Sequence, residues 1–215
     1  MNHEHYISLK EKGWAEFNSD STDSELISIA SNIGEITEHP NGQYVFSLKP
    51  KLEKNAIKGT FSGKHGLNDF PLHTDTAFYK KPARYILMHS INPSNCDTTL
   101  LLKNSFWDLL TKAEKIKAER AIYLVKTNRE KFYTSFIFRD NNEQGFKYDP
   151  SCMSPVNKYA KEFDQILNKI LLEIPLINVK WSGNKTLIID NWNILHGRKS
   201  AQNDIKRELK RIYIN

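Results

Sequence analysis

Two side chains with metal-binding chemistry stand one residue apart in the segment FPLHTDTAF (70–78). Because successive residues of an extended strand point to opposite faces, His73 and Asp75 would project from the same face. An imidazole and a carboxylate on one face can converge on a single metal ion. The same pair is also compatible with a hydrogen-bonded strand pair that holds no metal, and the dipeptide pattern alone leaves both interpretations open.

A third candidate ligand lies far along the chain, in the segment DNWNILHGR (190–198), which we predict to be a late strand ending at His196. Two histidines and one carboxylate form the facial ligand set that holds Fe(II) on one side and leaves the opposite positions open. The structural alternative for His196 is a hydrogen-bonded residue at a strand end. The three residues make an iron site a hypothesis that further elements must support.

Two arginines near the C-terminus, Arg207 and Arg211, fall in a predicted terminal strand. If that strand returns antiparallel beside the one that bears His196, it brings an arginine toward the metal. The rigid guanidinium fork pairs with carboxylates through two charge-assisted hydrogen bonds. At about 3.3 Å per residue the two arginines share a face but lie roughly 13 Å apart, so we expect them to serve different anions, unless one is structural.

The elements that must position these residues are mostly strands. One predicted helix begins at Thr22, which forms a capping box with Glu25, and ends at Gly34; a second begins at its cap, Ser154, and stops at Pro175. Segments rich in β-branched and aromatic residues predict strands at 44–48, 83–91, 98–102, 121–125, 132–138, 186–190 and 210–214. This pattern predicts a mainly β protein with flanking α-helices, an antiparallel sandwich or jelly roll, in a single domain over residues 1–215.

The composition is that of an ordinary globular chain, because 39% of the 215 residues are hydrophobic and 26% are charged. No segment reaches the roughly 18 consecutive apolar residues of a membrane helix, and residues 1–14 lack the apolar stretch of a secretory signal. We therefore expect a cytoplasmic protein without a membrane partner. The net charge of +6 comes mainly from scattered lysines, which favours a solvated surface over a nucleic-acid partner.

Several motifs occur in a meaningful order: HTD (73–75), the pair Asp97 and Thr98, NWNILHGR (191–198), and R-x-x-x-R (207–211). This order resembles the taurine dioxygenase and clavaminate synthase-like Fe(II)/2-oxoglutarate-dependent oxygenases, and the resemblance covers most of the chain. The family implies a double-stranded β-helix, in agreement with the strand pattern. It also implies that 2-oxoglutarate and O2 are converted to succinate and CO2 at an Fe(II) cofactor while an unactivated C–H bond of a small substrate is oxidised.

Carried over residue by residue, the resemblance makes His73, Asp75 and His196 the iron ligands and the catalytic centre. Arg207, eleven positions after His196, matches the arginine that pairs with the distal carboxylate of 2-oxoglutarate. Thr98 matches the hydroxyl residue that supports the same cosubstrate.

The resemblance bears on the substrate less directly. Arg211 matches a position that faces the acidic group of the prime substrate in some members, which suggests an amino acid or an amino-acid-derived acid. Phe78, Tyr148 and Asp149 are weaker candidates for substrate binding. Because related halogenases carry a small residue in place of the ligand carboxylate, Asp75 argues against halogenation, whereas hydroxylation, desaturation and ring formation stay open.

Some residues and functions stay open at this point. His65, in the loop GKHGLND (63–69), and Arg198, which stabilises either a loop or the cosubstrate edge, have no assigned role, and His89 is expected to be a core histidine. The same chemistry on a macromolecular, carrier-bound or nucleotide substrate is one alternative function. A non-catalytic jelly-roll module whose basic surface binds nucleic acid is another. The sequence carries no signal for an oligomeric state.

Overall fold

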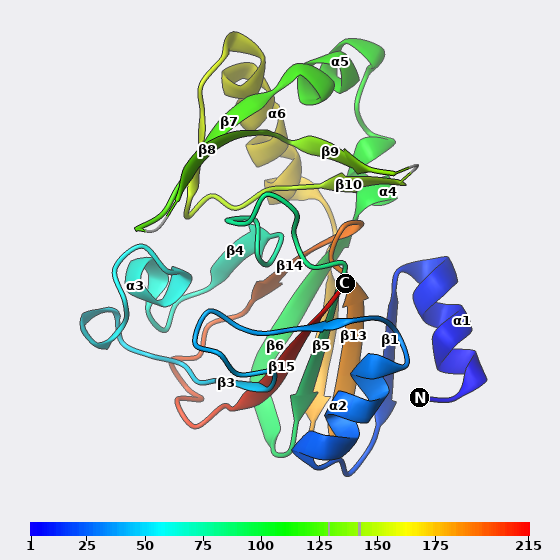
Figure 1. Ribbon diagram of the computed structural model, residues 1–215. Coiled ribbons are helices and arrows are strands. Elements are labelled where there is room, and N and C mark those ends of the chain that lie inside the picture. The colour runs from blue at the N-terminus through cyan, green and yellow to red at the C-terminus, as the bar shows by residue number, and fades with distance from the viewer. Residues whose placement is uncertain (129, 142) are drawn as a thin grey trace.

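The computed structural model describes residues 1–128, 130–141 and 143–215, and it consists mainly of strands with helices around them (Figure 1). The helices are α1 (His3–Lys12), α2 (Asp23–Ser31), α3 (Phe61–His65), α4 (Lys103–Trp107), α5 (Lys112–Arg120) and α6 (Lys158–Glu173), with a 3-10 turn η1 (Glu53–Asn55). The strands are β1 (Trp14–Asn18), β2 (Ile36–Thr37), β3 (Phe46–Leu48), β4 (Phe70–His73), β5 (Tyr85–Ser90), β6 (Pro93–Leu102), β7 (Ile122–Lys126), β8 (Lys131–Ser135), β9 (Ile137–Asp140), β10 (Glu143–Phe146), β11 (Met153–Pro155), β12 (Ile177–Ser182), β13 (Lys185–Asp190), β14 (Ile194–Arg198) and β15 (Leu209–Ile214).

Two sheets form the centre of the fold. The larger has the strand order β1-β13-β5-β15-β2, with β3 also paired to β15, and the smaller has the order β12-β6-β14-β4. Strand pairing within both sheets is antiparallel. The prediction of a mainly β jelly roll, or double-stranded β-helix, with flanking helices is confirmed.

Apolar side chains from alternate strand positions fill the space between the two sheets. Ile86 and Met88 of β5 meet Leu100 of β6 and Trp181 of β12 in one buried cluster. Leu87, between the two β5 residues, turns to the opposite side of the sheet, beneath α1 and α2. This period of two gives the larger sheet one face for the interior and one for the helices.

A second apolar cluster lies above the small sheet, where α5 and α6 cover further strands (Figure 1). These strands form a three-stranded sheet, β11-β7-β8, and a two-stranded sheet, β10-β9. The predicted strand at 132–138 is two strands, because β8 pairs with β7 and β9 pairs with β10. The buried Phe136 separates them.

The two predicted helices occur, with different boundaries. Thr22 and Glu25 form the predicted capping box, and α2 ends at Ser31, before Gly34. The second helix, α6, begins later than predicted.

Asn157, and not Ser154, caps α6, because the Asn157 side chain accepts a hydrogen bond from the backbone N–H of Ala160. Residues 153–155 pair with β7 instead and form the edge strand β11, where a proline such as Pro155 is tolerated.

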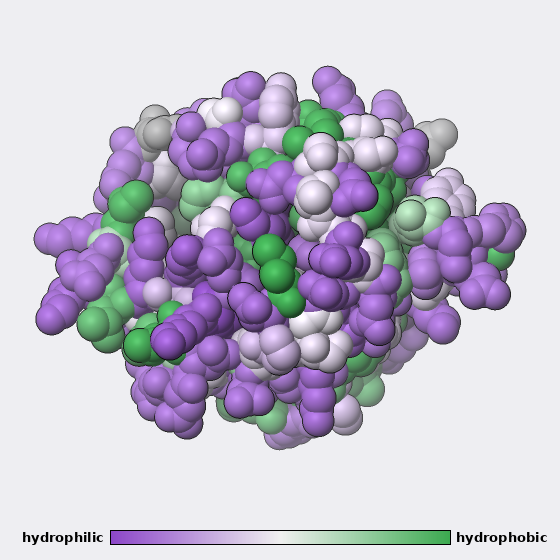
Figure 2. Space-filling view, turned by 90° about the horizontal axis from the view of Figure 1, so that it is seen from below, coloured by the Kyte–Doolittle hydropathy of each residue, from purple (hydrophilic) through white to green (hydrophobic). Residues whose placement is uncertain are grey.

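The outer surface is mainly polar on the side seen from below. Hydrophilic residues cover most of this face, and hydrophobic ones lie between them in small groups (Figure 2). On this face, the residues that the structure describes therefore form no broad apolar area. Among the described residues, no helix is both long enough and apolar enough to cross a membrane.

Lys147 is a buried amine directly after β10. Its Nζ donates to the main-chain carbonyls of Tyr79 at 2.9 Å and Lys80 at 2.5 Å, and the rings of Phe132 and Phe138 lie 5.5 and 5.7 Å away. Burial lowers the pKa of the Lys147 ammonium to about 8. The amine fastens the loop before β5 to the end of β10.

We expect this amine to make folding stability depend on pH. Between pH 8 and the ordinary lysine pKa of 10.5 the amine is neutral only in the folded chain, so the unfolded state binds more protons and stability rises with pH. The free energy of unfolding of the wild type, relative to that of Lys147→Met, should rise by about 2 kcal/mol between pH 7.5 and pH 10. Urea titrations at both pH values measure it. Lys180→Met, which removes an exposed lysine of β12, controls for the lost charge, and a difference that stays constant with pH would contradict the prediction.

Candidate metal centre

Two of the three predicted ligands lie side by side on neighbouring strands. β4 and β14 are antiparallel, and His73 is the register partner of His196, with ring centroids 4.4 Å apart. Both side chains are buried. Gly197 permits the close packing of β14, because a Cβ there would lie 2.7 Å from the carbonyl oxygen of Phe70 and 2.8 Å from Oγ1 of Thr99.

Asp75 reaches the histidines by a route that differs from the predicted one. β4 ends at His73, so the two residues do not share the face of one strand. The chain turns at Thr76, which has a left-handed φ of 57°. The Asn191 side chain holds the turn: its Oδ1 accepts from the backbone N–H of Asp75 at 2.9 Å, and its Nδ2 donates to the Asp75 carbonyl at 3.0 Å. The predicted convergence occurs, but a turn produces it.

The donor atoms of the three side chains face one small volume. Nε2 of His73 lies 3.7 Å from Oδ1 of Asp75, and Nε2 of His196 lies 3.6 Å from Oδ2. One donor atom from each residue lies within 4.8 Å of the other two. These separations are too long for hydrogen bonds and slightly wider than the roughly 3 Å between adjacent donors around an octahedral ion with bonds near 2.1 Å.

The hydrogen bonding of His73 also suits a metal ligand. Its Nδ1 donates to the main-chain carbonyl of Pro71 at 2.9 Å, because a carbonyl can only accept. That bond leaves the lone pair on Nε2, the atom that faces Asp75. The residues present therefore fit a divalent first-row metal.

Local charges keep the Asp75 carboxylate ionised. Burial alone raises the pKa of Asp75, but the Arg211 guanidinium and the two imidazoles together hold it well below its usual range. Burial lowers the pKa of His196, and the neighbouring His73 adds to this effect. Burial acts in the same direction on His73, where the adjacent Asp75 outweighs it and raises the pKa. An ionised carboxylate and a neutral imidazole are the forms that bind metals.

Arg211 contacts the Asp75 carboxylate directly. Its Nη1 donates to Oδ2 of Asp75 at 2.9 Å and to Oδ1 at 3.2 Å. The guanidinium carbon lies 4.6 Å from the ring centroid of Tyr213 and 5.9 Å from that of Phe46. No hydrogen bond within the described chain uses Nη2 of Arg211.

The sequence pattern suggested that the terminal strand lies beside the strand of His196. The structure places it elsewhere. β15 pairs with β5, β3 and β2 in the larger sheet, whereas β14 belongs to the smaller sheet. Arg211 therefore reaches Asp75 across the interior between the sheets. Arg207 precedes β15, which begins at Leu209, so the two arginines do not share a strand face.

Thr98 belongs to β6, and Arg207 is hydrogen-bonded to the same strand. Nε of Arg207 donates to the carbonyl of Cys96 at 3.1 Å, and the Thr98 hydroxyl accepts the indole N–H of Trp181 at 3.2 Å. Arg198 is the register partner of Thr98 on β14. Both arginines are buried, and within the described chain their hydrogen bonds go to main-chain carbonyls rather than to carboxylates. A buried guanidinium without an anion favours binding of one.

The weaker substrate candidates divide into two groups. Tyr148 and Asp149 are buried beside the segment of the candidate ligands His73 and Asp75, since the backbone N–H of Thr74 donates to the Tyr148 carbonyl at 2.7 Å. The charge of Asp149 contributes to the raised pKa of His73. Phe78 instead packs against the apolar cluster beneath α5 and α6.

The remaining histidine and arginine candidates have structural contacts. His89 is a buried core histidine, as expected, and its Nδ1 lies 2.9 Å from Oγ1 of Thr186. His65 belongs to α3, and its ring centroid lies 6.0 Å from that of Phe61. Nη2 of Arg198 donates to the carbonyls of Gly66 at 3.0 Å and Asn68 at 2.6 Å, so Arg198 stabilises the loop after α3.

Sequence reasoning missed three residues around the ligands. Asn191 holds the Asp75 turn, and Phe61 covers His73 with ring centroids 4.2 Å apart. His39 donates from Nε2 to the carbonyl of Arg211 at 3.0 Å, and burial together with the Arg211 charge lowers its pKa to about 4. Asn191 belongs to the motif NWNILHGR (191–198), whereas Phe61 and His39 lie in segments without regular hydrophobic periodicity.

Comparison with known proteins gives a match at the level of structure. No protein-family model and no functionally curated protein matches the sequence. An asparagine oxygenase in complex with Fe(II), 2S,3S-3-hydroxyasparagine and succinate has a TM-score of 0.79 at 14% identity, over 98% of this chain and 77% of that chain.

Two further structures agree with that match. For the non-haem iron oxygenase OrfP in complex with Fe and alpha-ketoglutaric acid the TM-score is 0.75 at 17% identity, over 99% of this chain and 77% of that chain. For PvcB from Pseudomonas aeruginosa the TM-score is 0.71 at 17% identity, over 98% of this chain and 78% of that chain. The chain has the fold of these oxygenases.

We expect the wild-type chain to bind one Fe(II) under anaerobic conditions, and Asp75→Ala to weaken that binding more than about a hundredfold, because the only anionic donor is lost. Isothermal titration calorimetry measures both affinities. His65→Ala, which removes the α3 histidine outside the donor set, is the matched control. Equal Fe(II) affinity in Asp75→Ala and the wild type would exclude this metal centre.

Proposed function

We propose that residues 1–215 form one catalytic domain of an Fe(II)- and 2-oxoglutarate-dependent oxygenase. Its reaction oxidises an unactivated C–H bond of a small substrate, an amino acid or an amino-acid-derived acid, with hydroxylation as the favoured outcome. The finer assignment to the taurine dioxygenase and clavaminate synthase-like family rests on the ordered motifs of the sequence.

The observation that carries this proposal is that a buried set of metal-binding donor atoms and a buried pair of arginines occur together. His73, Asp75 and His196 offer three donor atoms to one metal. Arg207 and Arg198 place positive charge along the same small sheet without a carboxylate partner in the described chain. A metal that takes a bidentate keto acid, and a buried cation for that acid's far carboxylate, together match 2-oxoglutarate.

Fe(II) held by His73, Asp75 and His196 would supply, together with 2-oxoglutarate and O2, the oxidising power for C–H cleavage, and 2-oxoglutarate would leave as succinate and CO2. The Pro71 carbonyl orients His73, and Arg211 keeps Asp75 ionised. The Phe61 ring lies against the ring of His73.

In the proposed complex, Arg207 binds the distal carboxylate of 2-oxoglutarate and Thr98 donates a hydrogen bond to it. Arg207 is well suited because its Nε is held by the Cys96 carbonyl, which leaves both terminal nitrogens for an anion. The fork then forms paired, charge-assisted hydrogen bonds.

For the prime substrate, two charged side chains border the metal ligands. Arg211 contacts Asp75 and retains an Nη2 without a hydrogen-bond partner in the described chain. The negative charge of Asp149 raises the pKa of His73. One cation and one anion suit the carboxylate and ammonium groups of an amino acid. The solved relatives point the same way, since two were crystallised with 3-hydroxyasparagine and (3S)-hydroxy-L-Arg. Tyr148 would line the same side, and Phe78 supports it from the core.

Binding of the cosubstrate is directly testable. Anaerobic addition of 2-oxoglutarate to the Fe(II) protein should produce a weak visible charge-transfer band, and Arg207→Gln should raise the 2-oxoglutarate concentration for half-saturation by about 10- to 100-fold, the loss expected for a charged hydrogen bond. Arg139→Gln, which removes an exposed arginine of β9, controls for the lost charge. Equal half-saturation in Arg207→Gln and the wild type would refute the role of Arg207.

The substrate class is tested by a screen for succinate release. Because the site borders both a cation and an anion, we expect free amino acids to raise the succinate rate above the rate without substrate. Mass spectrometry of the stimulating amino acid should show the addition of one oxygen atom. If only carrier-bound amino acids, nucleotides or peptides stimulate, the small-substrate assignment is wrong.

A further inference from the structure

Trp181 is a buried tryptophan whose indole N–H serves a single partner. A register shift in β12 follows Val179, the partner of Thr98 on β6, and displaces Trp181 along the strand. Its side chain is 2% exposed, and Nε1 donates to Oγ1 of Thr98 at 3.2 Å in a buried setting. The irregularity thus brings an indole N–H to the hydroxyl that the proposed function assigns to the cosubstrate.

This contact determines what the Thr98 hydroxyl can do. An indole N–H can only donate, so the Thr98 oxygen is the acceptor, and its own proton must point elsewhere. Thr98 is 2% exposed, and no acceptor for its O–H occurs in the described chain. A buried hydroxyl donor without an acceptor is costly unless a ligand supplies one.

The groups around this hydroxyl indicate the kind of acceptor. Arg207 is bound to the carbonyl of Cys96, two residues before Thr98, and Arg198 is the cross-strand partner of Thr98. The side chains of Arg207 and Arg198 are both buried. A hydroxyl donor without an acceptor in the described chain, with one buried arginine at its cross-strand position and another bound to its own strand, favours an anionic oxygen.

On the basis of the proposed function, we propose that Trp181 is a positioning residue for 2-oxoglutarate: its indole N–H occupies the acceptor side of the Thr98 hydroxyl, so that the hydroxyl proton points at the distal carboxylate. Trp181 does not touch the cosubstrate. Its hydrogen bond fixes the orientation of the Thr98 hydroxyl before the cosubstrate binds, and this preorganisation lowers the entropic cost of binding.

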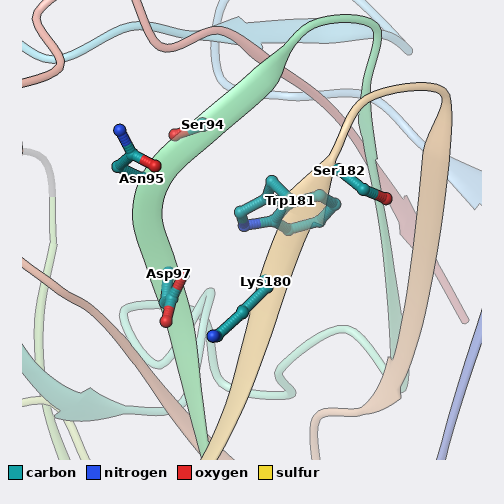
Figure 3. A pocket seen from close by; sticks show the side chains of 6 residues that line it. All are labelled: Ser94, Asn95, Asp97, Lys180, Trp181 and Ser182. Atoms are coloured by element: carbon teal, nitrogen blue, oxygen red, sulfur yellow. The ribbon is translucent and has the colours of Figure 1, made fainter.

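Trp181 also borders a hollow at the surface. Figure 3 shows Trp181 on β12 between Lys180 and Ser182, with its ring nitrogen on the β6 side. Together with Ser94, Asn95 and Asp97, these residues line a surface hollow. The indole therefore also closes the interior, so an informative variant must keep the aromatic ring and remove only the N–H.

Trp181→Phe is that variant, and Thr98→Val removes the hydroxyl. Each should weaken 2-oxoglutarate binding, measured by anaerobic titration of the charge-transfer band, by about three- to tenfold, while Fe(II) affinity stays unchanged. Because both changes act through one hydrogen-bonded unit, the double variant should bind no more weakly than Thr98→Val alone. Trp192→Phe, which loses an equally buried indole N–H bonded to the carbonyl of Pro82 at 3.0 Å, is the matched control with wild-type affinity.

Trp181→His retains a ring N–H and should therefore bind 2-oxoglutarate more tightly than Trp181→Phe. If Trp181→Phe does not fold, Thr98→Val is the reference, and Trp181→His should bind 2-oxoglutarate at least as tightly as that variant. Unchanged affinity in Trp181→Phe, or losses that add in the double variant, would overturn the role of Trp181 while the oxygenase assignment stands. A wild-type protein without any 2-oxoglutarate-dependent band would overturn both.

Discussion

The Asp75 carboxylate is withdrawn from water between two imidazoles and the Arg211 guanidinium. A charge buried in this way is stable only when its partners are held in position, because an unpaired buried ion costs several kcal/mol. The surrounding structure provides these supports. The Pro71 carbonyl orients His73, Tyr213 lies under Arg211, and the Asn191 side chain clamps the backbone of Asp75 itself.

The two-sheet architecture explains how residues so distant in sequence meet. β4 and β14 place the imidazoles in register on the small sheet, and β15 approaches from the larger sheet. An apolar cluster packs between the sheets, and it includes Leu100, the register partner of His196. A dry interior strengthens each electrostatic contact of the centre and lowers the tolerance for a missing one.

Positive charge is distributed in a way that the overall composition does not reveal. The net charge of +6 is carried mainly by lysines. The arginines near the centre have distinct contacts: the partly buried Arg211 is paired with the Asp75 carboxylate, whereas the buried Arg207 and Arg198 are bound to main-chain carbonyls. Under the proposed function, these guanidinium groups and the Thr98 hydroxyl would form an anion site that is prepared before the anion binds, and the contact of Trp181 with Thr98 would extend this preparation to neutral groups.

Local patterns were sufficient for much of the fold. The capping box at Thr22 begins α2 because both of its hydrogen bonds form within one helical turn. Alternation of β-branched and aromatic residues marks strands because a strand between a core and a second layer needs apolar side chains at fixed positions. The start of α6 was misplaced because residues 153–155 find hydrogen-bond partners in β7, far along the chain.

The sequence by itself determined the types and order of the candidate ligands, His73, Asp75 and His196, and the jelly roll that carries them, since both depend on residue chemistry and short periodic patterns. Only the tertiary structure decided that a turn brings Asp75 to the histidines, and that Arg211 reaches it from the opposite sheet. It also decided that Trp181 contacts Thr98. Strand partners, turn conformations and register shifts depend on contacts between distant segments, which no local pattern records.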